Sequence, residues 1–247
     1  MARRKTDPAL LETRPPLDDD PVVKGLLKAI SLRRIGPGTK LVADQLVEAF
    51  GSNRIHIRQV FEHLSSRNII RLYPNRGAYV AEPTVEEARQ IFATRRILER
   101  AVVLDLIERL DEKSSAILRS HVDHAEHHEA EDRWGTLTRT GEFHGVLAEL
   151  AGNAVSARFV DELVLRTSLI IATFEAHSGA DDCSPDAHPG IAERILARDR
   201  DGAISAMDAH LRAMEERLHF EVPQQKQQDL TAIFAELGVK KRSRRTG

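Results

Sequence analysis

The stretch from residue 21 to residue 80 constrains the fold most, because three short helical patterns and a hairpin follow one another there within 60 residues. Apolar residues recur every three or four positions in each pattern, as an amphipathic helix requires. The first pattern runs over 22–30 and should end near Gly36-Pro37-Gly38. The second contains Leu41, Leu46, Val47 and Phe50, and the third contains Ile57, Val60, Phe61 and Leu64.

The connections between these patterns predict their arrangement. Gly51 can end the second helix, and Asn53 can cap the third. The run 69–73 turns through 74–77 into 78–80, which predicts a β-hairpin. Two helices joined by a tight turn form a helix-turn-helix, and a hairpin directly after it is a wing. Residues 21–83 are therefore predicted to form a winged helix-turn-helix domain.

The rest of the chain is predicted to be helical. Thr84 and Glu87 form a capping box that opens a long helix to about Leu110. Further helical patterns cover 113–130, 134–151, 153–177, 188–198 and 202–221. The fold class is therefore mostly α, with an N-terminal winged helix-turn-helix and a C-terminal all-helical bundle over 84–222. Residues 1–20 are expected to form a mobile arm, and 223–247 a tail with a short amphipathic piece and a basic end.

Composition agrees with such an organisation. The 247 residues suffice for two modest domains, and 41% apolar, 30% charged and 4% aromatic residues fit a helix-rich globular protein. No apolar run is long enough to cross a bilayer or to act as a signal peptide, and Cys183 is the only cysteine. We therefore expect a cytoplasmic protein with no membrane partner.

Charge is distributed unevenly along the chain. Residues 21–80 carry ten Lys and Arg against three acids, a balance of +7, whereas residues 81–238 have a balance of −13. A basic module joined to an acidic one indicates that the first binds a polyanion. Uneven surface solvation is the alternative reading of charge alone.

The candidate DNA-binding residues lie where a helix-turn-helix reads DNA. Base contacts come from the first two turns of the second helix, which here contain Arg54, Ile55, His56 and Arg58. Arg54 and Arg58 share one face, so one can address a guanine while the other reaches a base or a phosphate. Arg76, beside Gly77 at the hairpin tip, is placed to follow the DNA backbone. Ordinary solvated arginines are the alternative.

At these residues the chain resembles a known family. The stretch from Ile30 through Gly36-Pro37-Gly38 and Gly51 to Val60, followed by 74–80, resembles the winged helix of GntR-type bacterial regulators. The continuation Arg95 to Glu99, Phe143-His144, Ala151-Gly152-Asn153, His188, Asp199 and His210 resembles the FadR-like branch with its helical FCD effector domain. The family usually has Ser-Arg-Thr-Pro-Val-Arg where this chain has Asn53-Arg54-Ile55-His56-Ile57-Arg58. Both arginines remain and Asn53 can still cap, but Ile55 and His56 replace residues that face bases or phosphates.

The resemblance implies a ligand-responsive transcription regulator. Its expected partners are double-stranded operator DNA, a second copy of the chain and a small-molecule effector. The helical domain would bind the effector and hold the dimer, and two-fold symmetry would match a palindromic operator.

Arg95 and Glu99 are candidate effector-binding residues. Arg95 falls inside the apolar stripe of its predicted helix, between Ile91, Leu98 and Val102, where an unpaired guanidinium would be costly. It therefore needs an anion. Glu99, one turn further on, can supply it as a structural ion pair, or a carboxylate effector can.

His144, His188 and His210 are the candidate metal ligands. Each sits on the apolar face of its own predicted helix, so spacing alone equally allows three core histidines. The resemblance favours a metal, because these positions match the family's three metal-binding histidines, and imidazoles suit Zn or Ni. One turn before His144, many relatives have an Asp as fourth ligand and this chain has Thr140, which we include in the effector site. Glu142 projects away from His144 and cannot easily replace that Asp.

Two other functions compete with the regulator. A metal-dependent enzyme on a histidine-rich bundle is one, although no HExxH, phosphate-binding Gly loop or nucleophile elbow supports it. An architectural DNA-binding protein without an effector is the other. His121, His124 and His128 share a helix face and form a reserve metal site, but neighbouring acids favour a solvated surface.

Overall fold

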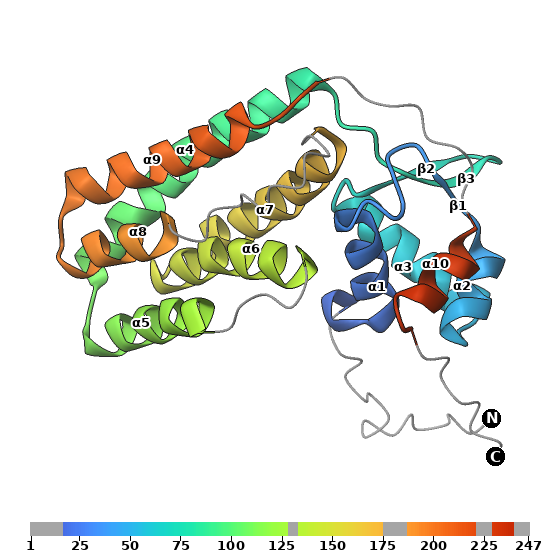
Figure 1. The fold of residues 1–247 in the computed structure, drawn as a ribbon, viewed down its shortest axis with the longest axis horizontal. Coiled ribbons are helices and arrows are strands. Elements are labelled where there is room, and N and C mark those ends of the chain that lie inside the picture. Colours follow the sequence, from blue (N-terminus) through green and yellow to red (C-terminus); the bar gives the residue numbers. More distant parts are fainter. Residues whose placement is uncertain (1–16, 128–132, 175–186, 221–228, 240–247) are drawn as a thin grey trace, which may run out of the picture.

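The computed structural model describes residues 17–127, 133–174, 187–220 and 229–239. Figure 1 shows two halves: a bundle of helices, and a smaller half in which shorter helices lie beside a small sheet. Each half has its own cluster of buried apolar side chains. The mostly α fold with a winged helix and a helical bundle is confirmed.

The smaller half follows the predicted order of elements. Its helices are α1 (Pro21–Ser31), α2 (Ala43–Phe50) and α3 (Arg54–Ser66), preceded by a 3-10 turn, η2 (Leu17–Asp19). The strands β1 (Lys40–Leu41), β2 (Ile70–Tyr73) and β3 (Gly77–Val80) form an antiparallel sheet in the order β1-β3-β2. Gly51 ends α2 with φ 60°, the left-handed conformation that glycine adopts without strain.

Leu41 is not helical, contrary to the sequence prediction. It lies in β1, opposite Ala78 of β3, and its side chain is buried in the core of the smaller half. The spacing between Leu41 and Leu46 suits a helix face, but Val42 is extended and α2 starts only at Ala43. Pairing with β3 satisfies the backbone groups of β1, which local spacing does not reveal.

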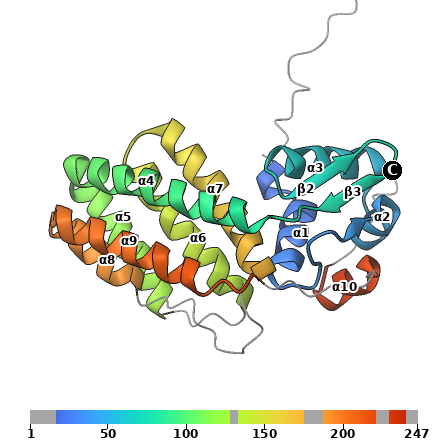
Figure 2. The ribbon, with the colours of Figure 1, turned by 90° about the horizontal axis from the view of Figure 1, so that it is seen from above.

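Both ends of the chain contribute to the smaller half. Asp20 caps α1 by accepting a hydrogen bond from the Val22 amide at 2.8 Å, and η2 precedes it within the expected mobile arm. In the expected tail, α10 (Leu230–Glu236) returns to pack against α1 and α2 (Figures 1 and 2). Phe234 is fully buried there, with its ring 4.8 Å from that of Phe50. Residues 17–20, expected in the mobile arm, and residues 230–236, expected in the tail, are therefore packed against the smaller half.

The larger half contains six helices among the described residues. They are α4 (Val85–Arg109), α5 (Glu112–His127), α6 (Arg133–Leu150), α7 (Ala154–Phe174), α8 (Ala187–Leu196) and α9 (Arg200–Glu216). The long helix α4 packs against α9 and α7, and α6 lies along α7 (Figure 1). Each predicted helix is present within a few residues where the chain is described, and none of the described helices is long and apolar enough to cross a membrane.

Half of the predicted capping box at the start of α4 is seen. The Thr84 hydroxyl accepts a hydrogen bond from the Glu87 amide at 3.1 Å, as an N-cap does. The Glu87 carboxylate, however, pairs with Arg166 of α7. The Glu87 side chain therefore forms an ion pair between α4 and α7 and does not bond to the Thr84 amide as a capping box would require.

Candidate functional site

The recognition helix α3 presents its first turn to solvent. Arg54 and Arg58 are the basic residues there, with side chains 76% and 82% exposed. In the structure Arg54 pairs with Asp44 of α2 at 2.7 Å and Arg58 with Glu62 at 3.0 Å. Exposed ion pairs contribute only about 0–1 kcal/mol, so either arginine can exchange its partner for another anion at little cost.

The side chain of His56, in the first turn of α3, is directed toward the start of α1. Its imidazole is half-buried, with Nε2 3.1 Å from the Asp20 carboxylate at the start of α1. Its backbone amide donates to the Asn53 side chain at 2.9 Å, so Asn53 is the N-cap, as predicted from its position. The His56 side chain thus joins α3 to α1, because Asp20 provides an anion on that side, and the neighbouring Ile55 faces solvent instead.

The wing carries the third arginine. Arg76 lies in the turn between β2 and β3, with its guanidinium 5.7 Å from the centre of the Tyr73 ring. Gly77 follows with φ 96°, a conformation that strains any residue with a Cβ atom. The tight turn therefore holds Arg76 at the tip of the hairpin.

A chain of buried polar contacts crosses the helical half. Nε of Arg95 donates to one oxygen of Glu99 at 2.7 Å, and Nδ1 of His144 lies 2.5 Å from the other. All three side chains are almost inaccessible to water. Burial alone would raise the pKa of Glu99, but the Arg95 charge and the hydrogen bonds from His144 and Arg95 lower it from 4.5 to about 2. Glu99 is therefore a carboxylate that only accepts hydrogen bonds.

The carboxylate decides the tautomer of His144. Because Glu99 cannot donate, Nδ1 of His144 must carry the proton of their hydrogen bond. Burial lowers the pKa of His144 against the opposing effect of Glu99, so the ring is neutral and Nε2 keeps a free electron pair. That buried nitrogen makes no hydrogen bond with any residue that the structure describes.

His188 and His210 approach the same nitrogen. Their Nε2 atoms are 3.3 Å apart, and one ligand nitrogen from each of the three histidines lies within 4.8 Å of the others. Burial is the main cause that lowers the pKa of His188 to about 2 and that of His210 to about 3, with a further contribution from His144. Two nitrogens bound tetrahedrally to zinc at ~2.0–2.1 Å would be about 3.4 Å apart. His188 and His210 have this spacing, and His144 lies close enough to them that the three neutral imidazoles could hold a divalent transition metal.

The positions around the histidines match the carboxylate–histidine–metal arrangement of known sites. A carboxylate that accepts the second ring proton of a histidine orients it and makes it a better ligand. Glu99 is the carboxylate that accepts the Nδ1 proton of His144. Thr140 lies one turn before His144 on α6, and Glu142 is exposed, so neither adds a carboxylate beside the histidines.

A small cavity opens beside His144. It has a free volume of about 20 Å³, enough for about one water molecule, and is lined by Arg95, Thr140, His144 and Met214 and, on α7, by Val164, Thr167, Ser168 and Ile171. Nη2 of Arg95 is buried and has no hydrogen-bond partner among the described residues. The structure thus brings together all six residues predicted for the effector and metal sites, with a cationic donor left over at the cavity.

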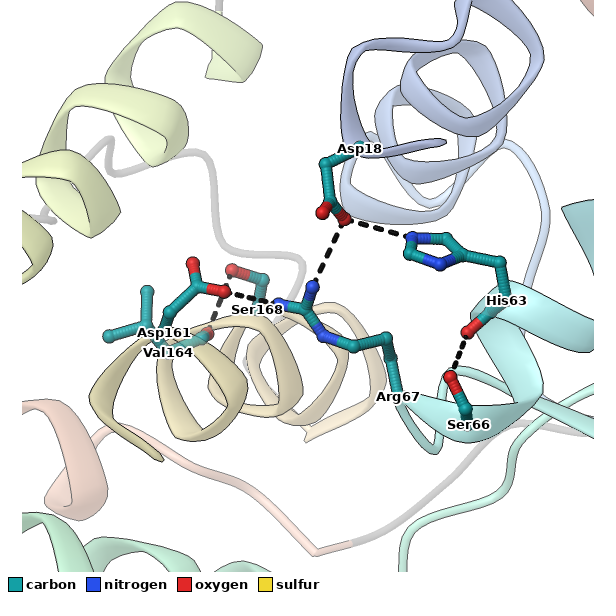
Figure 3. A network of polar contacts seen from close by, with 7 residues as sticks. All are labelled: Asp18, His63, Ser66, Arg67, Asp161, Val164 and Ser168. Atoms are coloured by element: carbon teal, nitrogen blue, oxygen red, sulfur yellow. Dashed lines mark hydrogen bonds and ion pairs between the residues drawn. The ribbon is translucent and has the colours of Figure 1, made fainter. Parts of the chain in front are cut away.

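Helix α7 also contacts the recognition helix. Arg67, directly after α3, donates to Asp161 of α7 at 2.6 Å and to Asp18 of η2 at 3.0 Å, and Asp18 also accepts from His63 of α3 (Figure 3). Val164 and Ser168, which line the cavity, lie on the same helix close to Asp161 (Figure 3). One helix therefore borders the cavity and holds the end of α3.

Comparisons with known proteins decide the family. The FCD domain matches residues 90–213. This match covers half of the chain and includes His144, His188 and His210. The HTH-type transcriptional repressor RspR of Escherichia coli K12 is 23% identical over an alignment of 194 positions, which covers 74% of this chain and 80% of that one. The chain belongs to the GntR-family transcription regulators with an FCD domain. It is a DNA-binding regulator and not an enzyme, so the enzymatic alternative is set aside.

Solved structures show the same fold for this GntR-family regulator. McbR/YncC of E. coli matches with a TM-score of 0.63 at 17% identity, covering 77% of this chain and 92% of that one. A putative GntR regulator from Rhodococcus sp. RHA1 gives 0.62 at 22% identity, covering 78% and 94%.

Several site residues of the regulator escaped the sequence analysis. Phe143 stacks on His188, with ring centres 4.2 Å apart, and fixes the plane of that imidazole. The Arg67–Asp161 contact joins residues 94 positions apart, so no local sequence pattern could predict it. In the reserve metal site, His121 stacks on Phe143, while the side chains of His124 and His128 lie outside the described part.

Proposed function

We propose that a small carboxylate, bound in the cavity beside Arg95, controls the affinity of this regulator for its operator. The unpartnered, buried Nη2 of Arg95 carries the proposal. Glu99 neutralises the guanidinium but leaves this donor unused, and a buried donor without a partner costs about 1–3 kcal/mol. A carboxylate oxygen at this point would recover that cost and make a charge-assisted hydrogen bond.

The size of the cavity means that an effector has to enlarge it. Its free volume of about 20 Å³ is enough for about one water molecule, so a bound carboxylate requires the surrounding helices to move apart. The Thr140 and Ser168 side chains add polar groups to the wall, and Val164, Ile171 and Met214 make the rest apolar. We infer an effector with one or two carboxylates on a short carbon skeleton.

His144, His188 and His210 would hold a zinc or nickel ion next to this effector. When bound, the ion supplies a strong positive charge and open positions for an oxygen ligand. Glu99 holds the proton on Nδ1 of His144 and so keeps Nε2 directed at the site. Because Thr140 brings no negative charge, the site favours an anionic effector more strongly than one with a fourth protein carboxylate would.

Helix α7 provides a route from the cavity to DNA. Val164 and Ser168 of α7 border the cavity, and Asp161, one turn earlier, holds Arg67 at the end of α3. We propose that filling the cavity shifts α7 and thereby changes how α3 is held. Arg33 adds to the link by donating to the Ile171 carbonyl at 3.0 Å.

On the DNA side we propose that Arg54 and Arg58 read bases, while Arg76 and Gly77 follow the backbone. Asn53 and His56 shape the first turn of α3.

The winged-helix unit would comprise 21–83 together with α10, and 84–222 would bind the effector and form a homodimer. Sedimentation at micromolar concentration tests the dimer; a monomer that still binds operator would contradict it.

The effector proposal is tested by thermal unfolding of the full chain with zinc, with nickel, and with a panel of short mono- and dicarboxylates, alone and together. We expect the largest rise in midpoint when metal and carboxylate are both present, since each ligand stabilises the folded state it binds. The active carboxylate should then change operator affinity in a gel shift.

Arg95→Met should weaken the response to carboxylate at least tenfold. Arg96→Met is the matched control, because the neighbouring Arg96 pairs with Glu215 of α9 and does not line the cavity. No carboxylate response in the wild type, or an equal response in Arg95→Met, would contradict the proposal.

A further inference from the structure

Ile55, in the first turn of the recognition helix, is an apolar side chain that does not pack into the core. Ile55 is 76% exposed, the highest value among the large apolar side chains that the structure describes. Its neighbours in the core, Ile57 and Val60, are fully buried and hold α3 against the rest of the smaller half. Ile55 therefore does not stabilise the fold.

The position of Ile55 is that of a reading residue. It lies between Arg54 and Arg58, both exposed, in the turn that enters the major groove first. His56, the next residue, is turned toward Asp20 and half-buried. Among the first five residues of α3, the exposed surface therefore consists of Arg54, Ile55 and Arg58.

We infer that Ile55 is a specificity-determining residue that contacts the 5-methyl group of a thymine in the operator. In the major groove the four base pairs offer hydrogen-bond donors and acceptors, and the thymine methyl is the apolar group among them. An isoleucine can form no hydrogen bond with a base edge, so its contact there is the burial of apolar surface against that methyl. The inference rests on operator binding through α3.

The expected magnitude is modest and specific to position. Burying one methyl group is worth about three- to tenfold in affinity. Each half-site should therefore contain one or two thymines whose methyl group matters, beside the guanines read by arginine. The remaining thymines should be insensitive.

The test uses deoxyuridine, which pairs with adenine as thymine does and lacks only the methyl group. The wild-type full chain first selects a binding fragment from a random double-stranded DNA pool. Each thymine of that fragment is then replaced singly, and dissociation constants are measured by gel shift for the wild type, Ile55→Ala and Ile97→Ala. Ile97 is the matched control: it is 74% exposed but lies on α4 in the helical half.

We expect a three- to tenfold loss at one or two thymines for the wild type and for Ile97→Ala, and no loss at these positions for Ile55→Ala. If no thymine is sensitive, or if Ile55→Ala keeps the sensitivity of the wild type, the inference is overturned while operator binding stands. If the selection yields no preferred fragment, operator binding through α3 fails and the inference fails with it.

Discussion

The buried histidines predict a steep loss of stability in mild acid. The perturbation is to lower the pH of metal-free protein from about 7.5 to about 5.5. In the folded state the pKa of His188 is lowered from 6.5 to about 2 and that of His210 to about 3, mainly by burial. The unfolded chain therefore binds protons that the folded chain does not, so stability is fully present above 6.5 and falls as the pH drops below it.

The magnitude follows from the two pKa values. Both folded-state pKa values lie well below 5.5, so between pH 7.5 and 5.5 each histidine takes up a proton only in the unfolded chain. Each histidine therefore lowers the free energy of unfolding by about 1.4 kcal/mol over this range. The pair should lower the free energy of unfolding by about 3 kcal/mol. A domain is stable by only about 5–15 kcal/mol, so the effect is large enough to measure.

The assay is urea unfolding of chelator-treated protein, followed by circular dichroism at several pH values. The double variant His188→Gln, His210→Gln cannot take up these protons, and its stability should depend on pH less steeply by the same amount. His219→Gln, which replaces an exposed histidine after α9, is the matched control and should keep the wild-type steepness. Equal pH dependence in the wild type and the double variant would refute the reasoning.

Three further predictions concern DNA, coupling and the core. Arg54→Ala and Arg58→Ala should each cost about 1–3 kcal/mol of operator binding in a gel shift, while Arg76→Ala should weaken all sequences more evenly; unchanged affinity in the double variant of the first two would contradict this. Arg67→Gln removes the contact with α7 and should at least halve the effect of the effector on operator affinity, with effector binding itself intact; a full response would exclude this route. Phe234→Ala should lower the free energy of unfolding of the smaller half by about 3–5 kcal/mol, measured by urea unfolding, because its buried ring packs on Phe50; a loss below 1 kcal/mol would mean that α10 is dispensable.

Local patterns in the sequence were sufficient for most elements. The period of Ile57, Val60, Phe61 and Leu64 predicted α3, and Asn53 predicted its first residue, because caps and amphipathic faces depend on neighbours within one or two turns. The wing followed from the turn at 74–77 for the same reason. Leu41 was misassigned, since the partner that makes it a strand, Ala78, lies far along the chain.

The site residues show the same division. His144, His188 and His210 stood out by their apolar surroundings and by the family resemblance, and the ambiguity of Arg95 between Glu99 and an effector was visible from their spacing.

Only the tertiary structure showed that the ion pair of Arg95 with Glu99 leaves a donor over, because Nε binds Glu99 while the buried Nη2 has no partner among the described residues. It also decided that Glu99 fixes the proton of His144, that α10 completes the smaller half and that α7 joins the cavity to Arg67. The Glu99–His144 contact joins residues 45 positions apart and the Arg67–Asp161 contact residues 94 positions apart, and the roles of Arg95 and His144 depend on the direction of single atoms. Periodicity along the chain contains no such information, since it describes which face of a helix is buried and not what that face meets.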